Sequence, residues 1–282
     1  HSVQHTSPHN AEWTGTPYEK LRFLAAGVNH MAFLLKLEAD GQDLYPKLRA
    51  CLDRPEIYKK EKVRFEILRH FGYFPTESSG HNSEYLPYFR KRQDLIDRFC
   101  RNDFPEVDEN GIDWNSMSAG VSGASVQICR GLQIRNEKQI AGYLDGSREI
   151  DLASSVEYGV QIIAAIEKNR PLAANLNVMN RGLIATLPPE CCVEVPCLVD
   201  GGGIVPGRIE DFPEQLAAID RGMVGAQILG AQGALDGDRR AIFHAIAADP
   251  NTQSKLGLDE IRSMTDELFD ALADVIDPRF SR

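Results

Sequence analysis

The stretch Ala26-Gly27-Val28-Asn29-His30-Met31-Ala32-Phe33 places a polar pair between two apolar runs. The run before the pair, residues 21–26, has the length of a β-strand, and the run after it, residues 31–38, alternates loosely between apolar and polar side chains. A turn at Ala39-Asp40-Gly41 closes the second run. We therefore predict two successive strands with His30 on the joint between them. Such a joint presents a side chain rigidly at the edge of a sheet.

Length and composition are those of an ordinary globular protein. The chain has 282 residues, of which 43% are hydrophobic, enough for one large domain or two small ones. Its 31 basic and 41 acidic residues give a formal net charge of −10 without a basic stripe, so nucleic acid is not an expected partner. No apolar run approaches the roughly 18–20 residues that cross a bilayer, so no membrane partner is expected either.

The cysteines argue against a disulfide framework or a structural zinc site. Six of them, at positions 51, 100, 129, 191, 192 and 197, are sparse for this length and show no repeated CxxC or Cys/His spacing. No signal-peptide pattern is visible. We expect reduced thiols in a cytoplasmic protein.

Apolar periodicity predicts several further elements. A helix is expected from Lys60 to Phe71 with Gly72 as its C-terminal cap. Residues 73–87 combine Gly, Pro, Ser, His and Asn, which predicts a long polar loop. Residues 103–123 are acidic and weakly periodic, which predicts an irregular surface stretch.

The second half of the chain is predicted to be mostly helical. A helix over residues 154–167 is expected to turn four apolar side chains inward, Val156, Val160, Ile163 and Ile166. Strands are expected at residues 172–179 and 191–199, followed by two amphipathic helices around residues 216–226 and 261–272. Gly201-Gly202-Gly203 lacks the GxGxxG pattern of a nucleotide loop and predicts a turn.

Several sequence blocks carry a resemblance to a known family. They are His1-Ser2-Val3-Gln4, Gly27-Val28-Asn29-His30-Met31, Phe71-Gly72-Tyr73-Phe74-Pro75-Thr76-Glu77-Ser78-Ser79-Gly80-His81, Glu84-Tyr85-Leu86-Pro87-Tyr88-Phe89, and Gly182-Leu183-Ile184 leading to Cys191-Cys192-Val193-Glu194-Val195. In this order they resemble the family 4 glycoside hydrolases, NAD- and Mn²⁺-dependent enzymes that include bacterial α-galactosidases. The resemblance runs the length of the chain.

The resemblance implies an α/β fold in two parts. Residues 1–30 would be the end of a Rossmann-type domain of the lactate/malate dehydrogenase kind. Residues 31–282 would form a mostly helical α+β C-terminal domain for substrate and subunit contacts. The family motif places a Cys directly before the position of His1, so we expect that Cys and most of the NAD-binding domain to lie upstream. The residues that contact NAD are therefore not assigned.

The resemblance also implies a metal ligand and an acid. His30 matches the histidine that binds Mn²⁺ together with the upstream Cys, and a neutral imidazole is a suitable ligand for such ions. His1 matches the position of the general acid near the leaving-group oxygen. An imidazole with a pKa of about 6.5 can hold and return a proton at neutral pH.

The base and the substrate contacts follow from the block after Pro75. Glu77 is the first candidate for the base that removes the sugar C2 proton, and Tyr85 is the second. His81 and Asn82 are predicted to contact sugar hydroxyls. Asn29 is predicted to orient His30 or the substrate, as neighbours of metal ligands commonly do.

The implied reaction begins when NAD⁺ takes a hydride from the sugar C3, forming a ketone that acidifies the C2 hydrogen. Mn²⁺ acts as a Lewis acid on that ketone, a base removes the C2 proton, and the glycosidic oxygen departs. Water then adds and the ketone is reduced, so NAD is regenerated within the cycle. This family is one of the exceptions to hydrolysis by two opposed carboxylates.

The expected substrate is a small α-linked oligosaccharide or glycoside, with an α-galactoside first. An α-glucosidase, an α-galacturonidase or an α-glucuronidase of the same family is the alternative. The expected assembly is a homodimer or homotetramer. A hypothesis of another class is an inactive C-terminal fragment that provides only subunit contacts. The Gly-x-Asn-His-Met block argues against a third hypothesis, a simple NAD-dependent dehydrogenase.

Overall fold

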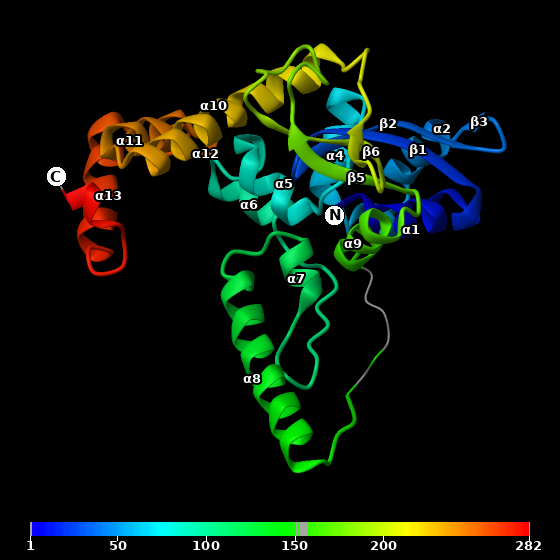
Figure 1. The fold of residues 1–282 in the computed structure, drawn as a ribbon, viewed down its shortest axis with the longest axis horizontal. Coiled ribbons are helices and arrows are strands. Elements are labelled where there is room, and N and C mark those ends of the chain that lie inside the picture. Colours follow the sequence, from blue (N-terminus) through cyan, green and yellow to red (C-terminus); the bar gives the residue numbers. More distant parts are fainter. Residues whose placement is uncertain (1, 151, 153–156, 282) are drawn as a thin grey trace.

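The two strands predicted around His30 form a hairpin at the centre of a sheet in the computed structural model (Figure 1). Strand β1 spans Leu21–Val28 and strand β2 spans Met31–Ala39, and they pair antiparallel with Val28 opposite Met31. The structure describes residues 2–150, 152 and 157–281. The prediction of two strands joined at His30 is confirmed.

Other strands extend this hairpin on both sides, in the order β3-β2-β1-β6-β5. The additional strands are β3 (Gln42–Asp43), β4 (Phe74–Pro75), β5 (Leu172–Met179), β6 (Cys192–Asp200) and β7 (Gly203–Pro206). Strand β4 also pairs with β2, and β7 pairs with β6 across the turn predicted at the three glycines. The pairings are antiparallel, and the strands predicted at 172–179 and 191–199 are confirmed.

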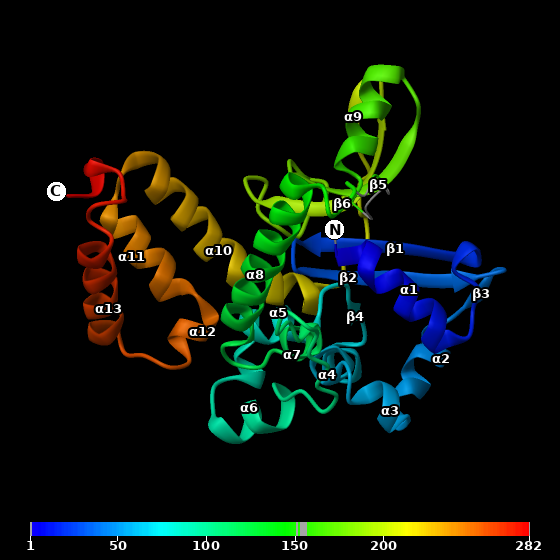
Figure 2. The same cartoon turned by 90° about the horizontal axis from the view of Figure 1, so that it is seen from below.

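Helices cover the sheet and form two projections (Figures 1 and 2). The α-helices are α1 (Ser2–Thr14), α2 (Tyr45–Ala50), α3 (Pro55–Tyr58), α4 (Lys62–Phe71), α5 (Ser79–Tyr85), α6 (Gln93–Phe99), α7 (Trp114–Ser118), α8 (Ala124–Asp145), α9 (Gly159–Lys168), α10 (Glu214–Asp236), α11 (Arg239–Ala248), α12 (Pro250–Gln253) and α13 (Leu258–Ala271). Short 3-10 helices are η1 (Tyr18–Lys20), η2 (Cys51–Asp53), η3 (Pro87–Phe89) and η4 (Pro278–Ser281). Helix α8 forms one projection, and α10 leads to α11 and α13 in the other.

This architecture confirms the predicted α/β class with a mostly helical α+β part. The predicted helix at residues 60–71 is α4, and Gly72 ends it in the left-handed conformation with φ of 89°. The predicted domain boundary at residue 30 falls in the turn of the hairpin, and the division into 1–30 and 31–282 stays a prediction. Among the described residues, no helix combines the length and apolar character needed to cross a membrane.

The core lies on both faces of the β1–β2 hairpin because successive side chains of a strand point to opposite faces. Phe33 belongs to a cluster with Ile67 and Val195, and Leu34 belongs to a second cluster with Phe65. These five side chains are at most 1% exposed. Helix α4 contributes to both clusters, so it fixes the chain that follows it against the hairpin.

Two predictions of local structure are wrong. Residues 73–87 are not a loop but contain β4 and α5, because their small polar residues allow close packing. A Cβ on Gly80 would lie only 2.2 Å from the Met117 carbonyl oxygen.

The second wrong prediction is the inward orientation of the apolar side chains of α9. The side chains of Val160 and Ile163 are 78% and 62% exposed, since no described segment covers that helix face. Val156 lies outside the described residues.

Gly27 is the tightest point of the hairpin. Its φ is 147°, and a Cβ there would lie 2.6 Å from the Met31 carbonyl oxygen and 2.7 Å from the Ala32 Cα. Both neighbours are backbone atoms, so they cannot move aside without shifting the strand that begins beside His30. The sequence requires glycine here for both conformation and space.

We predict that Gly27→Ala lowers the free energy of unfolding by about 3 kcal/mol or more, because it combines backbone strain with overlap of backbone atoms. Gly41→Ala is the matched control. Gly41 also has a positive φ, 75°, but nothing lies within 4 Å of its Cβ position. It should cost only about 1–2 kcal/mol. Urea unfolding measures both, and equal costs would contradict the close approach.

Candidate metal centre

His30 is the second residue of the two-residue turn between β1 and β2. Its φ is 69°, a left-handed conformation uncommon for a residue with a side chain. The side-chain amide of Asn82 donates a hydrogen bond of 2.9 Å to the His30 carbonyl oxygen. The turn is therefore held from outside the hairpin, and the imidazole is 32% exposed at its tip.

Glu77 reaches His30 because β4 pairs with the start of β2. The Thr76 backbone N–H donates to the Ala32 carbonyl oxygen at 2.9 Å, which places the next residue beside the hairpin turn. The buried guanidinium of Arg64 donates to the Pro75 carbonyl oxygen at 3.0 Å. Contacts to the backbone of Pro75 and Thr76, the two residues directly before it, thus fix the position of Glu77.

Helix α5 brings two further side chains to the same place. Ser78 is its N-cap and accepts a hydrogen bond from the His81 backbone N–H. His81 and Tyr85 are four residues apart, so they lie on one face of the helix. That face is turned toward the hairpin, because Asn82 of the same helix bonds the His30 carbonyl oxygen.

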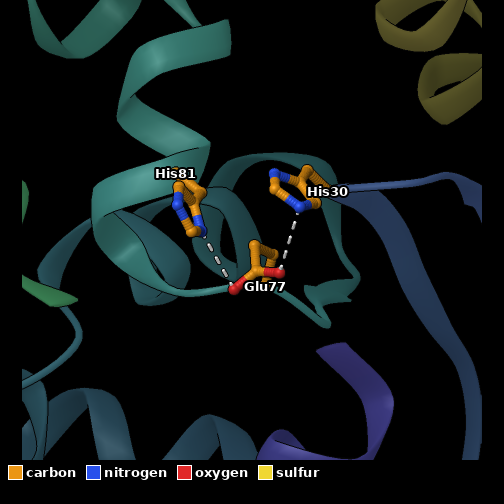
Figure 3. Close-up of side chains that lie close together, drawn as sticks. All are labelled: His30, Glu77 and His81. Carbon is orange, nitrogen blue, oxygen red and sulfur yellow. Dashed lines mark ion pairs between the residues drawn. The ribbon is translucent and has the colours of Figure 1, made fainter. Parts of the chain in front are cut away.

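The three side chains of Figure 3 converge on one small volume. His30 Nε2 lies 3.9 Å from Glu77 Oε2, and His81 Nδ1 lies 3.2 Å from Glu77 Oε1. The two imidazole rings have centroids 4.6 Å apart. On the other side of His30, the Tyr85 hydroxyl lies 3.5 Å from Nδ1. We call His30, Glu77 and His81 the His–Glu–His cluster.

The cluster contains a fixed negative charge. Burial opposes ionisation of Glu77, but the His81 side chain and the Ser78 N–H stabilise the carboxylate and lower its pKa to about 2. Glu77 in turn raises the pKa of His81, against the effect of burial. Burial lowers the pKa of His30, although Glu77 opposes this shift. Burial also raises the pKa of Tyr85, so its hydroxyl stays protonated in the absence of a cation.

The donor set fits a divalent metal ion. One ligand atom from each member of the cluster lies within 4.8 Å of the others, and each side chain is only partly buried. Two imidazoles and a carboxylate are the nitrogen and oxygen donors that suit Mn²⁺ and similar ions. The cluster is the one such group of three or more donors among the described residues.

The structure brings four of the predicted site residues together, namely His30, Glu77, His81 and Tyr85. Asn82 is fully buried beneath them, and Asn29 is exposed in the turn. Their roles as ligand, base and substrate contacts stay predictions. His1, the predicted acid, lies outside the described residues.

Three residues that support the site were not predicted from the sequence: Glu61, Arg64 and Glu194. The carboxylate of Glu61 accepts a hydrogen bond of 2.9 Å from the Ser79 hydroxyl and lies 3.3 Å from the Arg64 guanidinium. Glu194 is 1% exposed on β6 opposite Gly27, and burial and the charge of Glu77 raise its pKa. The position of Glu194 in a sequence block of the resemblance was the signal for it, whereas Glu61 and Arg64 are placed by contacts with Ser79 and Pro75, 18 and 11 residues away.

Known proteins resemble this chain over nearly its whole length. The sequence profile of the family 4 glycosyl hydrolase C-terminal domain matches residues 25–252. An α-galactosidase of Bacillus subtilis (strain 168) is 34% identical over 275 residues, which are 97% of this chain and 60% of that protein. An α-galactosidase of Rhizobium meliloti (strain 1021) is 30% identical over 280 residues, 97% of this chain and 54% of that protein.

The fold is shared with a solved structure. The crystal structure of a 6-phospho-α-glucosidase from gut microorganisms, in complex with NAD and Mn²⁺, has a TM-score of 0.66 and 12% identity. The match covers 97% of this chain and 59% of that chain. This chain thus spans a little over half the length of the proteins it matches.

We predict that Glu77→Gln lowers the pKa of His81 in the metal-free chain, because the side chain that raises it is lost. The ion pair persists from above the Glu77 pKa, about 2, up to the raised pKa of His81. Its contribution to stability is complete between the ordinary glutamate pKa of 4.5 and the ordinary histidine pKa of 6.5, and it is lost as the pH rises through the pKa of His81 or falls through that of Glu77. NMR titration of ¹³C-labelled histidine, after chelation of metals, measures the shift. An unchanged His81 pKa would contradict the geometry.

Proposed function

The chain belongs to the family 4 glycosyl hydrolases, whose C-terminal domain it contains, and we propose that the complete protein is an α-galactosidase dependent on NAD⁺ and Mn²⁺. The observation that carries this proposal is the His–Glu–His cluster, which offers metal donors where the family motif places His30. The α-galactosidases that are 34% and 30% identical support the substrate class. The 6-phospho-α-glucosidase bound to NAD and Mn²⁺ supports the cofactors.

His30 is the residue that would hold Mn²⁺, at the exposed tip of the hairpin. When bound, NAD⁺ supplies oxidation at the sugar C3 and Mn²⁺ supplies Lewis-acid polarisation of a sugar oxygen. The 282 residues contain no GxGxxG loop, so no residue of this chain is assigned to NAD. Substrate would approach the exposed sides of the three cluster residues, which are 17–32% exposed.

Tyr85 is the better of the two base candidates. A carboxylate with a pKa of about 2 is a weak proton acceptor at neutral pH, and Glu77 is already paired with His81. A phenolate is a far stronger base. Burial keeps the Tyr85 hydroxyl protonated, but it lies 3.5 Å from His30, where a bound cation would favour the phenolate. We therefore assign removal of the C2 proton to Tyr85.

Further roles in the proposed reaction fall to residues around the cluster. His1 would protonate the leaving oxygen, and His81 and Asn29 would lie beside the bound sugar. A homodimer or homotetramer would cover apolar side chains such as those exposed on α9. A cytoplasmic location is proposed from the sequence alone.

The complete gene product that contains this chain should hydrolyse an α-galactoside only when NAD⁺, Mn²⁺ and a reductant are all present. The reductant is needed because the second metal ligand expected upstream is a thiol. Release of p-nitrophenol from its α-galactoside, before and after removal of nucleotide and metal, measures this dependence. Activity that survives both removals would exclude the proposed reaction. Faster release from the α-glucoside or α-galacturonide would move the substrate assignment to that branch.

In the same protein, Tyr85→Phe should abolish exchange of the C2 hydrogen with solvent, because the proton acceptor is lost. The measurement is deuterium incorporation at C2 of the product formed in D₂O, at saturating Mn²⁺. Tyr88→Phe is the matched control, since Tyr88 is nearby in sequence but 52% exposed. Normal incorporation in Tyr85→Phe would return the role of base to Glu77.

A further inference from the structure

We propose that Glu61 is a positioning residue for the reaction, because it keeps the buried guanidinium of Arg64 from drawing the Glu77 carboxylate out of the cluster. The inference rests on the proposed function only for its effect on turnover. Its structural part concerns the direction of the Glu77 carboxylate, which points toward His30 and His81 (Figure 3). Glu61 acts through its contacts with Arg64 and α5.

Arg64 carries a positive charge inside the protein core. Its side chain is 2% exposed, and its guanidinium carbon lies 4.3 Å from the centre of the Phe74 ring. A guanidinium keeps its proton in proteins, so it cannot avoid the cost of burial by becoming neutral. A carboxylate must compensate the charge, because a buried ion without a partner is strongly destabilising. Glu61 provides this compensation, with its Oε1 3.3 Å from Arg64 Nη1.

A second carboxylate, that of Glu77, acts on the same guanidinium. Burial lowers the pKa of Arg64, and the negative charges of Glu61 and Glu77 both oppose that shift. The Arg64 Nε and Nη2 groups donate to the Pro75 carbonyl oxygen at 3.3 and 3.0 Å, two residues before Glu77. Glu77 nevertheless turns toward the imidazoles, with its Oε1 3.2 Å from His81 Nδ1. Two carboxylates thus act on one cation, and the ion pair with Glu61 satisfies it.

Glu61 is held in place by the residue that begins α5. Its Oε2 accepts hydrogen bonds from the backbone N–H and the hydroxyl of Ser79, at 3.2 and 2.9 Å. The Ser79 hydroxyl in turn accepts from the Arg64 backbone N–H at 3.4 Å. The Glu61–Arg64 pair therefore contacts Pro75 and Ser79, two residues before and two residues after Glu77. Because both oxygens of Glu61 are engaged, the guanidinium has a fixed partner and Glu77 is left to face the imidazoles.

The direct test is a crystal structure of the complete gene product carrying Glu61→Gln, with no added metal, nucleotide or sugar. Glutamine keeps an oxygen that accepts from Ser79 but removes the charge that compensates Arg64. We expect the Glu77 carboxylate to rotate onto the guanidinium, to about 2.8 Å, and to leave His81. A Glu77 carboxylate that stays on His81 in this variant would overturn the inference.

A double variant keeps the test decisive where Glu61→Gln does not fold. Adding Arg64→Met removes the uncompensated cation, and replacing both members of a buried pair by uncharged residues is tolerated better than removing one. In the double variant we expect Glu77 to remain beside His81, as in the wild type. Displacement of Glu77 from His81 in the double variant would mean that the pair is only a mechanical support, which contradicts the inference.

Turnover provides the functional readout. With an α-galactoside at saturating NAD⁺ and Mn²⁺, Glu61→Gln should lower kcat about 10–100-fold, the range typical of residues that support a site from outside it. The double variant should recover most of that loss, although it lacks both members of the pair. A purely structural role predicts the opposite order, because the double variant has lost more contacts. A kcat in the double variant equal to or below that of Glu61→Gln would therefore count against the inference.

Glu66→Gln is the matched control. Glu66 also lies on α4, its side chain is 11% exposed, and its Oε1 lies 3.2 Å from Nε of an arginine three residues later. Its partners lie outside the segment that carries Glu77, and they are Tyr58, Arg69 and His70. Its loss should lower stability and leave kcat unchanged, and a fall in kcat as large as that of Glu61→Gln would remove the specificity claimed for Glu61. An inactive parent protein would refute the proposed function, and the two crystal structures would still decide the position of Glu77.

Discussion

The hydrogen bond from the Asn82 side chain to the His30 carbonyl oxygen is the contact on which the site depends. It joins residues 52 positions apart, and it fixes a turn whose second residue is in a left-handed conformation. Asn82 is fully buried, so losing its partner would leave a buried polar group unsatisfied at a cost of about 1–3 kcal/mol. This bond ties α5 to the hairpin turn and so keeps His81 beside His30.

The electrostatics of the site follow from one ionised carboxylate in a half-buried position. Glu77 stays charged because His81 and the Ser78 N–H compensate for the loss of water. The same carboxylate raises the pKa of His81 against the effect of burial, whereas burial still lowers the pKa of His30 although Glu77 opposes that shift. A site with this balance is suited to hold a divalent cation, and it is poorly suited to use Glu77 as a proton acceptor. In the proposed reaction the carboxylate of Glu77 therefore holds charge at the site, and the neighbouring Tyr85 phenol takes the proton.

The sequence predicted the parts of the fold that local patterns control. The apolar run at residues 21–26, the helix ended by Gly72, and the strands at 172–179 and 192–200 all reflect periodicity and turn residues. The prediction of a loop at residues 73–87 is wrong because serine and glycine are typical of loops and also of closely packed helices. Gly80 is the decisive case, since its lack of a side chain permits contact with Met117.

The site itself was only partly predictable. A sequence motif identified His30, but no local pattern shows that Thr76 bonds Ala32, and that bond carries Glu77 to the turn. Arg64 and Glu61 belong to a buried ion pair that composition cannot distinguish from surface charges. The contact between Thr76 and Ala32 joins segments 44 residues apart, which only the folded structure reveals.

The central claim is that the turn between β1 and β2 holds a divalent metal ion at His30, beside Glu77 and His81. The most direct measurement is a crystal structure of the complete gene product with Mn²⁺, with anomalous scattering recorded at the manganese edge. The account predicts a manganese peak at bonding distance from the His30 imidazole. A manganese peak elsewhere in the protein, with none at His30, would contradict it.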